Sequence, residues 1–215
     1  SALEFIERDA IDWTLKYTDI KIQINDDVKA HLLLEVDGND IDILYKDCER
    51  IFEVMEIFEC GEILLADSES QKNQIWKIRR SVGEAVKSNS VYKEEDTVVP
   101  RAELAKLLKG VKAIGIEYGF QSVCYGHAGD GNLHINIIKG EMSDEDWNAK
   151  LTLGIREIFE LTKSLGGTLS GEHGIGLVQK EYMDIVFSKE ALCLQKGIKN
   201  LFDPNEILNP GKILL

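Results

Sequence analysis

Apolar positions recur along the chain with two periods, and they predict both helices and strands. Spacing of the i, i+3, i+4 type indicates amphipathic helices at 3–17, 40–59, 68–87, 101–118, 143–165 and 180–201. Short apolar runs predict strands at 30–36 and 62–67, and the segment 121–138 reads as two strands joined by a turn. The segment 91–100 has neither period, and we expect it to be irregular.

The order of these elements indicates an α+β fold. A hairpin combined with helical crossovers is typical of an antiparallel sheet that helices cover mainly on one face. We therefore expect a ferredoxin-like antiparallel sheet followed by a C-terminal helical segment, with residues 1–215 forming one domain. The first predicted helix lies at the very start of the sequence, which suggests that the chain was cut from something longer, although a helix can also open a complete protein.

Composition narrows the possible partners and location. The 215 residues include 25 basic and 38 acidic side chains, and the resulting charge of −13 would repel nucleic acid. Charges interrupt every apolar stretch well short of the roughly 18 residues that a membrane span needs, and no secretory signal is visible. We expect a cytoplasmic protein, with peripheral membrane association left open. Four scattered cysteines are expected to be buried, reduced thiols: Cys48, Cys60, Cys124 and Cys193.

A glycine-rich hairpin carries the first candidate chemistry. Asp130-Gly131 between two apolar segments is a strong turn signal, and His127 and His134 flank it. If the two histidines lie opposite each other, their Cβ atoms would be about 4.5–5.5 Å apart and both rings could bind one divalent ion. The alternative is a polar hairpin whose histidines only form hydrogen bonds. A bulge in the turn would change this register.

A second glycine-rich segment, 166–176, contains Glu172 and His173. Its glycine spacing matches neither the G-x-G-x-x-G motif nor the P-loop motif of phosphate-binding loops. Ser170 lacks the G-x-S-x-G motif of a serine hydrolase nucleophile. Glu172 could complete a set of two histidines and one carboxylate around a metal, with His173 as a base that titrates near neutrality. The alternative is a helix N-terminus with Glu172 in its first turn.

Three motifs, in this order, resemble a known family. They are YGHAGDGNLH at 125–134, SGEHGIG at 170–176 and FDPNEILNPGK at 202–212. Together they are similar to the C-terminal substrate and metal domain of FAD-linked 2-hydroxyacid oxidases and dehydrogenases, in the vanillyl-alcohol oxidase superfamily. Members of this family act on D-lactate, glycolate or D-2-hydroxyglutarate.

The resemblance implies a role for each matching residue. His127, His134 and Glu172 would bind zinc, manganese or iron, and His173 would take the proton of the substrate hydroxyl. Two further residues would bind the 2-hydroxy acid. Arg79 would bind the substrate carboxylate, and Asn136 would help to hold the acid. Asn209 would contact the FAD, which a flavin-binding domain upstream would hold.

The leading hypothesis is therefore that the chain is part of an FAD-dependent enzyme. This enzyme would oxidise a D-2-hydroxy acid to the 2-oxo acid and pass electrons to an unknown acceptor. A free-standing metallohydrolase is the main alternative, and a non-catalytic partner domain is another. The substrate stays open, because Lys93 and Glu94 compete for the position of a family lysine that reaches the far end of dicarboxylates.

Overall fold

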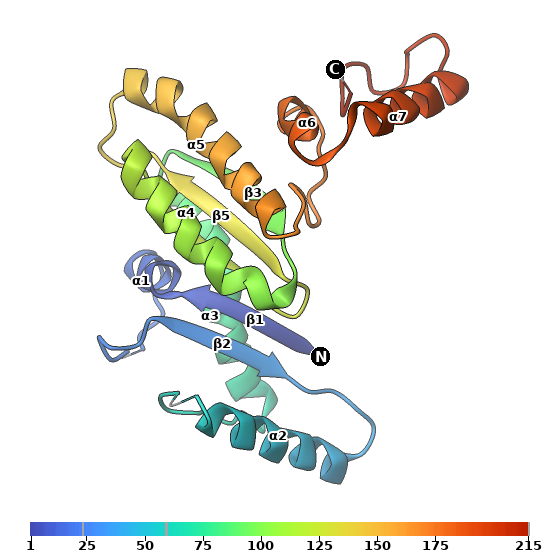
Figure 1. The fold of residues 1–215 in the computed structure, drawn as a ribbon. Helices are drawn as coiled ribbons and strands as arrows, with labels where there is room; N and C mark the ends of the chain where they lie inside the picture. The colour runs from blue at the N-terminus through green and yellow to red at the C-terminus, as the bar shows by residue number, and fades with distance from the viewer. Residues whose placement is uncertain (23, 59, 215) are drawn as a thin grey trace. The chain divides into compact units, whose positions relative to one another are not determined.

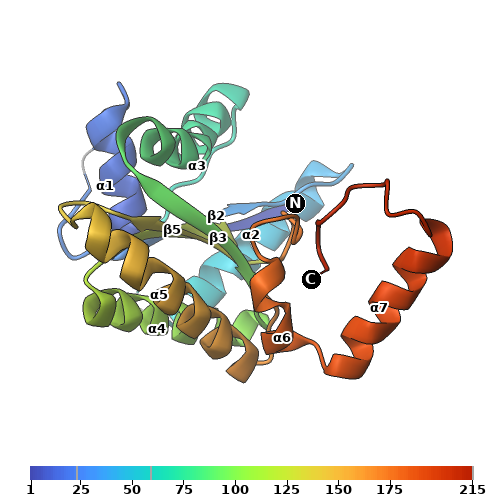
Figure 2. The same ribbon diagram turned by 90° about the horizontal axis from the view of Figure 1, so that it is seen from above.

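The computed structural model describes residues 1–22, 24–58 and 60–214 of the chain. The chain forms two compact units, one of residues 1–90 and 123–129 (unit 1) and one of residues 91–122 and 130–215 (unit 2). Figures 1 and 2 show the ribbon from two directions. Among the described residues, no helix is both long and apolar enough to cross a membrane.

Unit 1 is built around strand β1 (Ala2–Glu7), which has an antiparallel neighbour on each side. β2 (Ala30–Glu35) pairs along its whole length, and the end of β4 (Gln121–His127) pairs on the other edge. Helix α1 (Arg8–Tyr17) packs against α3 (Glu69–Asn89). Helix α3 begins with a capping box, in which Ser68 is the N-cap.

The core of unit 1 lies between these elements. Its buried apolar side chains from β1, α1 and α3 include Ile6, Ala10, Ile11, Ile78, Val82 and Val86. Helix α2 (Ile41–Glu56) is amphipathic and begins at Asp40, whose carboxylate accepts from two backbone N–H groups, yet it contributes no buried residue.

Unit 2 contains the antiparallel pair of β3 (Tyr92–Val98) and β5 (Asn132–Ile138), which are in register over their whole lengths. Every residue of β5 is buried. Helices α4 (Leu104–Tyr118) and α5 (Asp144–Ser164) pack on each other and cover one face of the pair (Figure 1). A short turn, η1 (Arg101–Glu103), leads into α4.

The C-terminal part of unit 2 is helical, as predicted. It consists of η2 (Lys180–Tyr182), α6 (Met183–Val186) and α7 (Lys189–Phe202). Helix α7 has no buried residue among those described. Antiparallel strands with packed helices and this C-terminal segment confirm the predicted α+β class.

Several predicted boundaries are wrong. The segment 3–17 is not one helix, because residues 2–7 form β1. Leu3 and Phe5 also fit the alternation of a strand, and pairing with two neighbouring strands decides between helix and strand. The segment 62–67 is not a strand, and Leu64 is exposed there without a pairing partner among the described residues.

The segment expected to be irregular, 91–100, contains β3. The predicted helix 180–201 is interrupted where Ser188 caps a new helix. The helix predicted to reach Glu59 ends at Glu56, and Glu59 itself lies outside the described residues. The cysteines are free thiols, but only Cys124 of the four is buried.

Candidate functional site

The pairing of β3 with β5 brings four polar side chains onto one face of unit 2. Asp96 lies directly opposite His134, and Glu94 lies opposite Asn136. Residues two apart on a strand share a face, so all four side chains project to the same side. The intervening Leu133, Ile135 and Ile137 of β5 project to the other face and are fully buried in the core.

The loop after α5 reaches this polar face. Its beginning is joined to β3, because Thr168 and Val98 exchange two backbone hydrogen bonds. A few residues later the loop places Glu172 and His173 beside His134. Two motifs that lie far apart in the sequence therefore meet within one unit.

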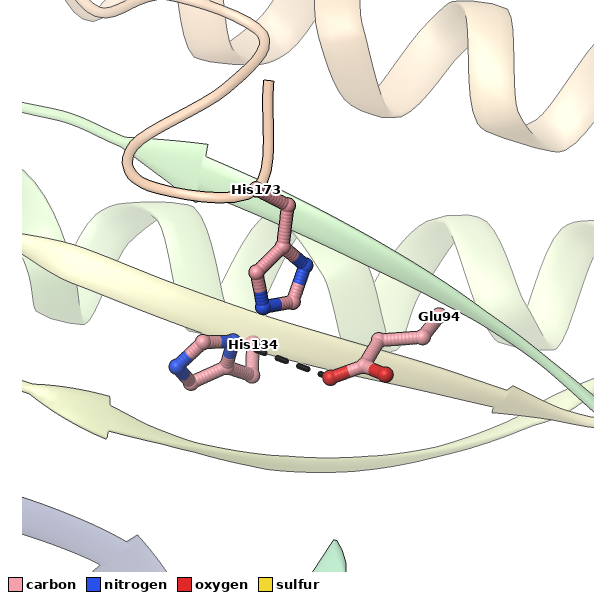
Figure 3. Close-up of side chains that lie close together, drawn as sticks. All are labelled: Glu94, His134 and His173. Atoms are coloured by element: carbon pink, nitrogen blue, oxygen red, sulfur yellow. Dashed lines mark ion pairs between the residues drawn. The ribbon is translucent and has the colours of Figure 1, made fainter. Parts of the chain in front are cut away.

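His134 is at the centre of this cluster. Its Nε2 lies 3.1 Å from Glu172 Oε1, and its Nδ1 lies 3.7 Å from Glu94 Oε1. The rings of His134 and His173 are 5.1 Å apart between centroids, and Figure 3 shows His173 and Glu94 both directed toward His134. The His134 side chain is only 6% exposed, whereas those of Glu172 and His173 are 50% and 45% exposed. The cluster is therefore buried at His134 and accessible to solvent at Glu172 and His173.

These donor atoms suit a divalent metal ion. Glu94, His134 and His173 each offer one ligand atom, and these atoms lie within 4.8 Å of one another. Glu172, whose Oε1 lies 3.1 Å from His134 Nε2, offers a second carboxylate at the other nitrogen of the ring. Imidazole nitrogen and carboxylate oxygen are common zinc ligands, and imidazole also suits iron, so the donor set fits the expected metals.

Burial and neighbouring groups shift the pKa values of Glu94 and Asp96 on β3 in opposite directions. Burial raises the pKa of Glu94, and the charge of His173 only partly opposes this shift. Burial would also raise the pKa of Asp96, but hydrogen bonds from the backbone N–H groups of His173 and Glu172, and from Asn132, outweigh it and lower that pKa. Asp96 is thus held as a carboxylate inside the unit.

Two of the predicted site residues lie in unit 1 and share a partner. Glu4 of β1 is buried, and its carboxylate lies 2.8 Å from His127 Nδ1 and accepts a 2.8 Å hydrogen bond from Arg79 Nε. The Arg79 guanidinium also stacks 4.7 Å from the centre of the Tyr125 ring. Glu4 therefore fixes the orientation of both His127 and Arg79 within this unit.

The other predicted residues lie in unit 2. Asn136 is nearly fully buried on the polar face of β5. Asn209 occupies the turn after α7 with a φ of 49°, and it accepts hydrogen bonds from the backbone and side chain of Lys212. The structure thus brings His134, Glu172 and His173 together.

The sequence interpretation missed several acids that lie beside the predicted site residues of their own unit. Glu94 and Asp96 lie in the segment that we expected to be irregular, and Glu4 lies in the strand that we expected to be helical. The alternation of Glu94 and Asp96 between Tyr92 and Val98 is a weak signal that could have indicated a strand. Lys93, by contrast, belongs to the opposite face and forms a 2.6 Å ion pair with Glu95.

The chain belongs to the family described as FAD linked oxidases, C-terminal domain, which it matches over residues 1–213. The resemblance predicted from the three motifs is thereby confirmed. The conclusion covers nearly the whole chain and both units.

Three relatives carry the names of hydroxyacid enzymes. The chain is 33% identical to the D-lactate dehydrogenase of Anaerostipes hadrus, and the match covers 99% of this chain and 46% of the relative. It is 32% identical to glycolate oxidase subunit GlcD of Bacillus subtilis (strain 168), covering 99% and 45%. It is 31% identical to the D-2-hydroxyglutarate dehydrogenase of Stutzerimonas stutzeri (strain A1501), covering 99% and 46%. The chain thus spans less than half the length of these relatives.

Two solved structures share the fold at low sequence identity. The structure of p-cresol methylhydroxylase with substrate bound has a TM-score of 0.64 and 13% identity, and the match covers 98% of this chain and 46% of that one. The 4-ethylphenol oxidase from Gulosibacter chungangensis, in its isoeugenol complex, has a TM-score of 0.58 and 12% identity, with 99% and 47% covered. Both are similar in fold to the present chain.

Proposed function

We propose that this chain is the substrate- and metal-binding part of an FAD-dependent oxidoreductase that oxidises a D-2-hydroxy acid to the 2-oxo acid. The observation that carries the proposal is the meeting of His134, Glu172 and His173 at one place in unit 2. Membership of the FAD linked oxidase family supports flavin chemistry over the hydrolysis that the same ligands could perform. The names of the relatives support a 2-hydroxy acid as the substrate.

His127, His134 and Glu172 are the proposed metal ligands. Their types suit zinc, manganese or iron. When bound, the divalent ion would polarise the substrate hydroxyl and FAD would accept the hydride. We propose that a flavin-binding domain, supplied outside this chain, holds the FAD, with Asn209 as a contact.

The remaining steps belong to side chains of this chain. His173 is nearly half exposed at the rim of the cluster, where it can reach a bound hydroxy acid and take its hydroxyl proton. Arg79 would bind the substrate carboxylate, and its guanidinium is already oriented by Glu4 and Tyr125. Asn136 would donate or accept a hydrogen bond from the polar face of β5.

The proposal is tested by reconstituting the chain with its flavin-binding region. Formation of 2-oxo acid is measured with D-lactate, glycolate and D-2-hydroxyglutarate and an artificial electron acceptor, and metal content is measured by plasma mass spectrometry. His134→Ala should lose both metal and activity, because it removes the central ligand. His31→Ala is the matched control, since His31 lies in β2 and is not one of the proposed site residues, and it should retain both. Full activity of His134→Ala, or a wild type that oxidises none of these acids, would refute the proposal.

A further inference from the structure

The carboxylate of Asp96 receives an unusual number of hydrogen bonds from one loop. Its side chain is fully buried, and Oδ2 accepts from three consecutive backbone N–H groups, those of Gly171 at 2.9 Å, Glu172 at 2.7 Å and His173 at 2.8 Å. Consecutive N–H groups that converge on one anion fix the backbone conformation of the residues that carry them. The carboxylate therefore defines the path of the loop at Glu172 and His173.

The same carboxylate is held from the strand side. Asn132 of β5 donates a hydrogen bond of 2.5 Å to Asp96 Oδ1 and a second one of 3.1 Å to the carbonyl of Thr97. The hydroxyl of Ser170 adds a hydrogen bond of 3.1 Å to Oδ2. Gly171 fits closely here, because a Cβ at this position would overlap the side-chain amide of Asn132. Asp96 thus joins β3, β5 and the loop.

A buried carboxylate is costly unless hydrogen bonds or charges compensate it. Five donors surround Asp96, three of them being the backbone groups of a loop that otherwise lies on the surface. Replacement by Asn keeps the shape but turns one oxygen into a donor. That donor must face either the loop N–H groups or the Asn132 amide, and both arrangements oppose donor to donor.

We infer that Asp96 is a positioning residue, which sets the backbone from which the metal ligand Glu172 and the base His173 extend. The inference rests on the proposed function of these two residues and adds a requirement to it. Loss of a residue that holds a metal ligand in place by hydrogen bonds typically lowers metal affinity or activity about 10–100-fold. We therefore expect Asp96→Asn to weaken divalent metal binding by about this factor while the chain stays folded.

The test measures Co²⁺ binding to the chain by its visible spectrum, together with the Tm of each variant. Asp203→Asn is the matched control. Asp203 is also buried, and it accepts hydrogen bonds from the backbone N–H groups of Ile207 and Leu208 at 3.0 and 2.9 Å in a different loop. Both variants should lower Tm, but only Asp96→Asn should weaken Co²⁺ binding. Wild-type Co²⁺ affinity in a folded Asp96→Asn variant would overturn the inference.

A second variant and a second readout cover the remaining outcomes. If Asp96→Asn does not fold, Ser170→Ala removes one donor from the same oxygen and should weaken Co²⁺ binding several-fold, whereas unchanged affinity would contradict the inference. If the wild type binds no Co²⁺, the proposed metal site fails by itself. Hydrogen exchange of the loop amides 171–173 then decides the role of Asp96: faster exchange in Asp96→Asn supports it, and unchanged exchange overturns it.

Discussion

Glu172 and His173 are neighbours in the sequence, yet their side chains have different relations to the cluster. Glu172 Oε1 lies 3.1 Å from His134 Nε2, whereas the His173 ring stands beside the His134 ring at 5.1 Å between centroids. The first geometry suits two ligands of one ion, and the His173 side chain is 45% exposed. The two residues can therefore be separated by experiment.

His173→Ala and Glu172→Ala should have different effects on metal content in the reconstituted enzyme. Loss of the base should lower kcat by about 10²–10⁴ while metal content stays near normal. Loss of a ligand should lower metal content, and excess metal should restore part of the rate. Plasma mass spectrometry and steady-state kinetics measure both effects. If His173→Ala also strips the metal, His173 is itself a ligand, as the grouping of Glu94, His134 and His173 would allow.

Glu94 is predicted to influence substrate choice. It lies opposite Asn136, on the face that carries His134, and Lys93 belongs to the other face. A substrate with a second carboxylate near Glu94 would meet a like charge, and each 1.4 kcal/mol of such repulsion changes affinity about tenfold. Glu94→Gln should therefore raise the ratio of kcat/KM for D-2-hydroxyglutarate to that for D-lactate by about tenfold. The exposed Glu117→Gln should leave this ratio unchanged. An unchanged ratio in Glu94→Gln would show that Glu94 does not contact the variable end of the substrate.

At the scale of elements, the sequence predicted those helices and strands that local sequence signals determine. The helices that follow Ser68 and Ser143 were found because their apolar residues recur at helical spacing, and the hairpin was found because of Asp130-Gly131. β1 and β3 were missed because their buried acids, such as Glu4 and Glu95, have partners far away in the sequence. The candidate site was predicted in its motifs but not in its supporting acids, for the same reason.

The edge strand β2 is predicted to make stability depend on pH. Burial lowers the pKa of His31 below 6.5, and the charge of Arg8 lowers it further. The unfolded chain therefore binds a proton at a higher pH than the folded chain does. This contribution to stability is complete above pH 6.5 and is lost as the pH falls toward the folded pKa.

His31→Gln should remove this dependence. Between pH 7.5 and 5.5 the free energy of unfolding should fall less in the variant than in the wild type, by under about 1.4 kcal/mol per pH unit because His31 is partly exposed. Guanidinium titrations at the two pH values measure the difference. A larger fall in His31→Gln would mean that His31 gains, rather than loses, proton affinity on folding.

At the scale of the whole molecule, the chain has two compact units, each with residues of the proposed site. Unit 1 carries His127 and Arg79 around Glu4, and unit 2 carries the cluster around His134. The chain spans 45–46% of the hydroxyacid enzymes that it resembles. Our proposal therefore assigns the FAD to a flavin-binding region outside residues 1–215.

The chain produced alone should fold and bind divalent metal, but it should be colourless and should not reduce an artificial electron acceptor with any 2-hydroxy acid. The reason is chemical: its histidines and carboxylates can bind a metal and move a proton, but none of these groups accepts a hydride. Addition of the separately produced flavin-binding region should restore 2-oxo acid formation, and the visible absorbance of the flavin should bleach when substrate is added without an acceptor. The same experiment with Glu172→Ala should keep the flavin colour but bleach far more slowly, because the flavin is held elsewhere while the proposed metal ligand is lost. Stoichiometric yellow flavin on the chain alone would contradict the assignment of the flavin to another region and would place the flavin site within residues 1–215.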